Sequence, residues 1–132
     1  AVWDSLPGLE AQPDYVQEYA AIWNGMRKLV YSRTPAGTPA AGAELRTSFD
    51  KAEIERLKET ESGDIGIGGA DLASQALSLG LLDELYLYVF PVLVGSGKRW
   101  LEGRSLQGLR KTESREFRGG VAMGRYEIGG SA

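Results

Sequence analysis

The chain has 132 residues and a mass of 14.3 kDa, which is the size of one domain with its own core. It contains no cysteine and no histidine, so disulfides, thiolate or imidazole metal sites and a Ser-His-Asp triad are excluded, and no metal site is expected. The net charge of −3 disfavours a nucleic-acid partner, and no apolar run reaches the roughly 18 residues of a membrane span. We therefore expect a cytoplasmic protein with neither kind of partner.

The first third of the chain predicts one helix and two short strands. Pro13 is a good first-turn residue, and apolar residues then recur at helical spacing as far as Gly25. The run at 27–31 predicts a buried strand. Two prolines and two glycines make 32–42 a loop, and residues 43–47 predict a second short strand.

The middle of the chain predicts a strand–helix–strand unit after a further helix. Asp50 and Glu53 form a capping box for a helix over 51–59. Next come a strand over 64–68, a helix over 70–79 and an aromatic strand over 85–90. Gly80 ends the helix, and Leu81 is the apolar residue that follows it. The length of this unit suits a right-handed parallel crossover.

The end of the chain predicts a β-hairpin, since residues 112–117 and 121–128 alternate on either side of a turn with Gly119 and Gly120. Together the elements predict an α/β fold of three layers. It would have a mostly parallel central sheet and an antiparallel C-terminal hairpin at its edge.

Two segments carry backbone or side-chain chemistry suited to phosphate. Gly68 and Gly69 end a predicted strand and open a helix, where free amides and the helix dipole favour an anion. On their own they favour a tight structural turn, because neither the dinucleotide fingerprint nor the P-loop pattern is complete. Ser32, Arg33 and Thr34 follow a buried strand, and they fit either a phosphate site or an ordinary polar loop.

Other candidate side chains have structural explanations, which the sequence favours. Asp83 and Glu84 could serve as an acid and a base, but they also suit a solvated turn after a helix. Tyr86 and Tyr88 share one face of the predicted strand, as packing residues do.

The order of these segments resembles the dihydrofolate-reductase-like superfamily. It is most similar to the reductase domain of the riboflavin-biosynthesis deaminase–reductase and to its stand-alone bacterial relatives. The resemblance covers nearly the whole chain, residues 1–132, as a single domain. It rests on KLVYSRT (28–34), ERLKE (55–59), DIGIGGADLASQALSLGLLDEL (64–85), YVFPVLVGSGKRWLE (88–102) and GGVAMGRYEI (119–128).

The resemblance implies NADPH as the cofactor. It assigns the cofactor's pyrophosphate to Gly68, Gly69 and the amides of Ala70 and Asp71, and its 2′-phosphate to Ser32, Arg33 and Thr34. It assigns the substrate and nicotinamide side to Pro91, Val92, Leu93 and Gly95. It also implies a homodimer, and the apolar run at 81–94 is expected at or near the interface.

The N-terminal motifs of the family are absent from this chain, which contains neither an Asp-Gly dipeptide nor a Gly-Arg-x-Thr turn. We therefore expect the fold to lack the family's first strand and helix, and no catalytic residue is designated.

Three functions remain open. The first is a reductase that passes hydride from NADPH to a pterin-like or ribityl-amino-pyrimidine-like small molecule. The second is a non-catalytic nucleotide-binding or dimerisation module on the same fold. The third is an unrelated structural α/β domain.

Overall fold

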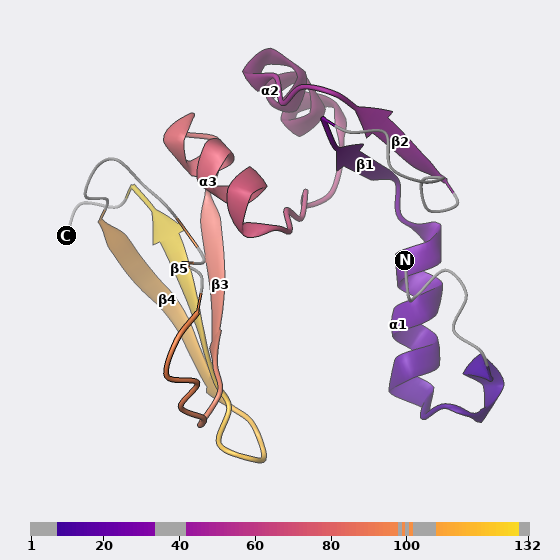
Figure 1. The fold of residues 1–132 in the computed structure, drawn as a ribbon, viewed down its shortest axis with the longest axis vertical. Coiled ribbons are helices and arrows are strands. Elements are labelled where there is room, and N and C mark those ends of the chain that lie inside the picture. Colours follow the sequence, from indigo (N-terminus) through magenta and orange to yellow (C-terminus); the bar gives the residue numbers. More distant parts are fainter. Residues whose placement is uncertain (1–7, 34–41, 98, 100, 102–107, 130–132) are drawn as a thin grey trace. The chain divides into compact units, whose positions relative to one another are not determined.

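The computed structural model describes residues 8–33, 42–97, 99, 101 and 108–129 (Figure 1). The chain forms two compact units, Ala1–Phe49 and Asp50–Ala132. The first unit contains η2 (Leu9–Ala11), α1 (Asp14–Gly25), β1 (Lys28–Tyr31) and β2 (Ala43–Arg46). The second contains α2 (Lys51–Thr60), α3 (Ala70–Ser78), β3 (Glu84–Val89), β4 (Leu109–Glu116) and β5 (Ala122–Ile128). The predicted α/β class, with parallel and antiparallel pairing, is confirmed.

In the first unit, β1 and β2 pair in parallel, with Tyr31 opposite Arg46. The amide of Ser32 donates to the carbonyl of Arg46 at 2.9 Å, so the ladder continues one step beyond β1. Lys28 Nζ lies 5.5 Å from the ring centroid of Trp23, and this cation–π contact connects β1 to α1.

Glu44 links the two strands of this sheet through its carboxylate. One oxygen accepts a hydrogen bond from Arg27 Nε at 2.8 Å, and the other pairs with Arg46 at 2.8 Å. Hydrogen bonds from Arg27 and then Arg46 lower the pKa of the Glu44 carboxyl below its ordinary value. The two guanidinium groups thus favour the ionised form of this carboxyl.

In the second unit, α2 begins and α3 ends with the capping residues that the sequence predicts. Asp50 caps α2, because its Oδ1 accepts the amide of Ala52 at 3.1 Å. At the C-terminal end of α3, Gly80 has φ 69°, and its amide donates to Leu77 O at 3.1 Å. The amide of Leu81 bonds to Ala76 O at 2.9 Å. These are the two hydrogen bonds of a Schellman motif.

Lys58 of α2 ties this helix end to the start of the sheet. Its ammonium donates to Leu81 O at 3.2 Å and forms an ion pair with Asp83. The carbonyl of Asp83 in turn accepts the amide of Ile128 at 2.9 Å. The segment between α3 and β3 is thus held on both sides.

The sheet of the second unit is antiparallel, with β5 between β3 and β4. The C-terminal hairpin is confirmed, and β4 begins at Leu109, earlier than predicted. One expectation is wrong, because residues 64–68 form neither helix nor strand. β3 pairs antiparallel to β5, which is the kind of pairing expected of the C-terminal hairpin. The described structure therefore contains no parallel crossover from 64–68 to β3.

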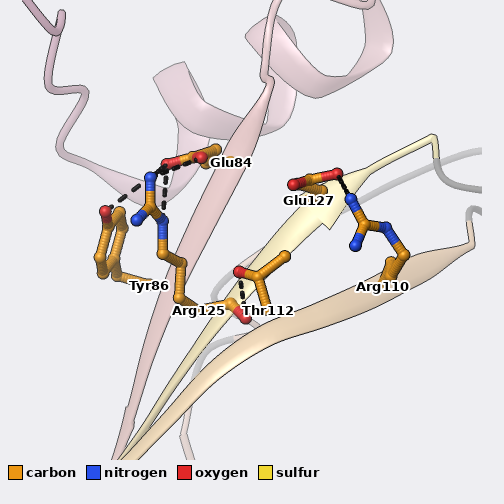
Figure 2. Close-up of polar contacts among 6 residues, drawn as sticks. All are labelled: Glu84, Tyr86, Arg110, Thr112, Arg125 and Glu127. Atoms are coloured by element: carbon orange, nitrogen blue, oxygen red, sulfur yellow. Dashed lines mark hydrogen bonds and ion pairs between the residues drawn. The ribbon is translucent and has the colours of Figure 1, made fainter.

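Polar side chains on one face of this sheet fix its register (Figure 2). Arg125 of β5 binds Glu84 of β3 with two nitrogens, Nε to Oε2 at 3.0 Å and Nη2 to Oε1 at 2.7 Å. Arg110 of β4 pairs with Glu127 of β5. At the bulge in β4, Thr112 donates to Arg125 O at 3.3 Å. A one-residue slip would separate these charges.

Among the described residues, none of the helices combines the length and the apolarity that a bilayer crossing requires.

The Schellman motif makes a stability prediction. Gly80→Ala should lower the free energy of unfolding by about 1–2 kcal/mol, because a side chain at positive φ is strained. The matched control is Gly63→Ala, since Gly63 is exposed, has no positive φ and has open space at its Cβ position. Urea unfolding of both variants measures the difference. Equal effects of the two substitutions would contradict the predicted role of Gly80.

The Glu44 pair predicts a pH dependence. A carboxylate with a lowered pKa stabilises the fold above its unfolded pKa, and the contribution is lost as the pH falls through its folded pKa. The stability difference between wild type and Glu44→Gln should therefore shrink as the pH falls below the unfolded pKa of 4.5. Urea unfolding followed by tryptophan fluorescence measures it. Glu18→Gln, which removes an exposed carboxylate on α1, is the control, and an equal change there would refute the assignment.

Candidate functional site

The start of α3 is the first candidate region, and glycines lead into it. Gly69 is the N-cap of α3, at φ 94° and ψ 124°, and no described side chain caps the helix. An added Cβ would meet nothing within 4 Å at Gly68 or at Gly69. Ala70 and Asp71 are exposed as well. The first amides of α3 therefore face open space.

The start of α3 differs from the start of α2 in how its first amides are capped. The Asp50 carboxylate satisfies an amide at the start of α2. At α3 the comparable position is glycine, so the amides of the first turn are left for an acceptor from outside the helix. An anion such as a phosphate group fits these amides and the positive end of the dipole. Asp71 lies in the first turn and accepts from Gln75 Nε2 at 3.4 Å.

The second candidate region is the carboxyl edge of the β1–β2 pair. Ser32 lies beside Arg46 through its backbone hydrogen bond, and Arg33 follows as an exposed residue. Thr34 lies outside the described residues. Arg46, Thr47 and Ser48 were not singled out from the sequence. The parallel register brings them to the edge where Ser32 and Arg33 were predicted to act.

The third candidate region follows β3. Pro91 is the centre of a three-residue turn, in which the amide of Val92 donates to Phe90 O at 2.8 Å. An added Cβ on Gly120 would lie 3.3 Å from Pro91 Cγ, so the hairpin turn packs closely against Pro91. Val92 and Leu93 are 66% and 104% exposed. The residues predicted for the substrate side, Pro91, Val92, Leu93 and Gly95, are thus all exposed.

The adjacent carboxylates at 83–84 have structural roles. Asp83 pairs with Lys58, and Glu84 pairs with Arg125. Asp83 lies in the segment before β3, as the turn explanation expects, whereas Glu84 is the first residue of β3. Within the described part of the chain, no three acidic side chains gather as a metal site would require.

Comparison with known proteins places the chain in a family. Residues 15–123 match the RibD C-terminal domain. The chain is 28% identical over 131 residues to the protein YyaP of Bacillus subtilis (strain 168), covering 98% of this chain and 69% of that protein.

Two solved structures share the fold. One, from Shewanella sp. PV-4, is described as a riboflavin biosynthesis protein. It matches with a TM-score of 0.68 and 18% identity, over 87% of this chain and 70% of that one. The other is a pyrimidine reductase-like protein of Corynebacterium diphtheriae. It matches with a TM-score of 0.55 and 21% identity, over 76% of this chain and 49% of that one.

The family match covers most of the chain, and it agrees with the resemblance that the sequence motifs carry. The chain belongs to the RibD C-terminal domain family.

Proposed function

We propose that this chain is an NADPH-dependent reductase domain that acts on a pterin-like or ribityl-amino-pyrimidine-like small molecule. The observation that carries the proposal is the start of α3, where glycine replaces a capping side chain and the first amides face open space. Membership of the RibD C-terminal domain family supports it. A bound NADPH would supply the hydride.

The residues near α3 fit the pyrophosphate of such a cofactor. Gly68 and Gly69 leave room for the phosphates, and the amides of Ala70 and Asp71 would donate to them. A side chain in place of Gly68 would enter this space. The protein's contribution there is to bind and orient the cofactor through backbone groups.

The residues at the carboxyl edge of β1–β2 fit a second, separate part of the cofactor. Ser32 supplies a hydroxyl and Arg33 a guanidinium, which are the groups that favour a phosphate monoester. Thr34 is assigned to the same role from its place in the sequence. Pro91, Val92, Leu93 and Gly95 are proposed for the substrate side, where they would exclude water from the reacting ring.

NADPH consumption tests the function directly. The chain is mixed with NADPH and, in separate reactions, with a pterin and a ribosyl- or ribityl-amino-pyrimidine, and nicotinamide absorbance is followed. Consumption that depends on one of these substrates supports the proposal. Binding of NADPH without consumption would favour the non-catalytic nucleotide-binding module instead, and absence of binding would refute both.

The role of the α3 amides predicts the effect of one substitution. Gly68→Val should weaken NADPH binding about ten-fold or more, since charge-assisted hydrogen bonds to the phosphates would be lost. Its effect on stability should be small, because Gly68 has no positive φ and no atom lies within 4 Å of its Cβ position. Gly69 is less suitable, since φ 94° strains any side chain there. Energy transfer from tryptophan to the nicotinamide measures binding.

The matched control for this substitution is Gly66→Val. Gly66 lies two residues earlier in the same exposed segment and also has open space and no positive φ. Equal losses of affinity in the two variants would contradict a contact between the phosphates and the start of α3.

We also propose that the domain forms a homodimer through the segment around β3. β3 is an edge strand, and the apolar residues at its end and beyond are strongly exposed: Val89 55%, Phe90 61%, Val92 66%, Leu93 104% and Val94 80%. Apolar side chains gathered in this way are typical of an interface.

The dimer predicts a mass of twice 14.3 kDa in sedimentation equilibrium. Leu93→Asp should shift the population toward monomer, because it would bury a charge in the interface. Gly97→Asp is the control, since it adds the same charge to the same loop at a position with open space. A wild-type monomer at all concentrations would show that something else covers these residues, such as another part of the same chain.

A further inference from the structure

The chain contains a single asparagine, Asn24, and a glycine follows it directly. The backbone nitrogen of the next residue is the nucleophile that attacks an asparagine carboxamide, and glycine leaves this nitrogen without a neighbouring side chain. Asn24 and Gly25 are both exposed, and an added Cβ at Gly25 would meet nothing within 4 Å. The pair is thus accessible to water and free of side-chain crowding.

These two residues are the last of α1, and this end of the helix is weakly held. The amide of Met26 donates to Ile22 O at 3.1 Å, but Met26 itself is already extended, at φ −74° and ψ 141°. The last turn contains no basic residue, and Gly25 has no positive φ that would form a glycine cap. Asparagine and glycine are also among the poorer helix formers. The C-terminal end of α1 therefore lacks the Schellman motif that ends α3.

Contacts on both sides limit how far this end opens. Ring closure at the carboxamide needs a backbone conformation that a helix does not adopt, so the last turn must open first. Before this turn, Trp23 contacts Lys28, and after it Arg27 Nε donates to Glu44 at 2.8 Å. The turn is therefore able to open while β1 stays paired. Helix ends open in this way at a lower free energy than a whole domain.

We propose that Asn24 deamidates spontaneously in the folded chain when the last turn of α1 opens. The Gly25 nitrogen attacks Asn24 Cγ, so a bond forms between these atoms and the Cγ–Nδ2 bond breaks. The amide proton of Gly25 leaves with the Nδ2 group as ammonia, and a succinimide ring remains. Water then opens the ring at either carbonyl, adding its hydroxyl to the carbon and its proton to the ring nitrogen. The products are aspartate and isoaspartate at position 24.

This inference is independent of the proposed reductase function, since no cofactor or substrate takes part. Incubation at mildly alkaline pH tests it, because the attacking nitrogen must lose its proton. Native chain and urea-unfolded chain are compared by ammonia release and by methylation with an isoaspartyl methyltransferase. The chain has no Asp-Gly pair that would form isoaspartate by the same route. The native chain should react measurably, and more slowly than the unfolded chain. A native chain that stays unmodified while the unfolded chain reacts completely would overturn the inference.

Two variants identify the reacting pair. Gly25→Ala should lose most of the reaction, even in urea, because the added methyl group hinders the nitrogen. This substitution should not disturb the fold, since Gly25 has no positive φ and has open space at its Cβ position. Asn24→Asp has no carboxamide to lose, so its ammonia release should fall to the background from glutamines. Undiminished release in either variant would place the reaction elsewhere in the chain.

Low concentrations of urea separate local from global opening. Opening of one helix end exposes little surface, so the rate of the native chain should rise only slightly with urea below the unfolding transition. A rate that rises with the full slope of global unfolding would mean that only the unfolded chain reacts. The proposed role of the α1 end would then be wrong.

The modification should weaken the junction between α1 and β1. Isoaspartate lengthens the backbone by one atom between two fixed contacts, that of Trp23 with Lys28 and that of Arg27 with Glu44. The isoaspartyl form should therefore have a lower urea midpoint than Asn24→Asp, which carries the same charge on an unaltered backbone. Equal midpoints would overturn this part of the inference.

Discussion

The chain enters α3 through Gly69 at φ 94°, a backbone conformation that side chains of L residues rarely adopt. This constraint has two consequences. It turns the chain from the irregular segment at 64–68 into a helix, and it removes the side chain that would otherwise cap the first amides. The proposed chemistry depends on both, because those amides are the only fixed donors that α3 offers to a phosphate.

The rest of the second unit holds α3 and the sheet together by backbone and charge. Lys58 of α2 contacts Leu81 and Asp83 in the segment after α3, and the carbonyl of Asp83 accepts the amide of Ile128 at the end of β5. The ion pair between Glu84 and Arg125 then fixes β3 against β5 (Figure 2). The carboxylates that the sequence offered as acid and base are used here as structural links.

Much of this fold could be predicted from local signals. Asp50 predicts the start of α2, and Gly80 with Leu81 predicts the end of α3, since capping depends on neighbouring residues alone. The glycine pair at 119–120 likewise predicts the hairpin turn, and both glycines have positive φ.

What local signals could not predict is the choice of partner strands. Alternation at 64–68 favoured a strand, but a strand needs a neighbour to pair with, and none of the described strands pairs there. The same limit explains why a parallel crossover from 64–68 to β3 was expected, because alternation encodes neither the partner nor the direction of a strand. Arg46 was missed for this reason too: only the register of β2 against β1 places it beside Ser32.

The most direct test of the central claim is a crystal structure of the chain with NADP⁺ bound. The pyrophosphate oxygens are expected within hydrogen-bonding distance of the amides of Ala70 and Asp71, with Gly68 and Gly69 against the phosphates. A cofactor bound at full occupancy elsewhere, with no phosphate oxygen near the start of α3, would contradict the account.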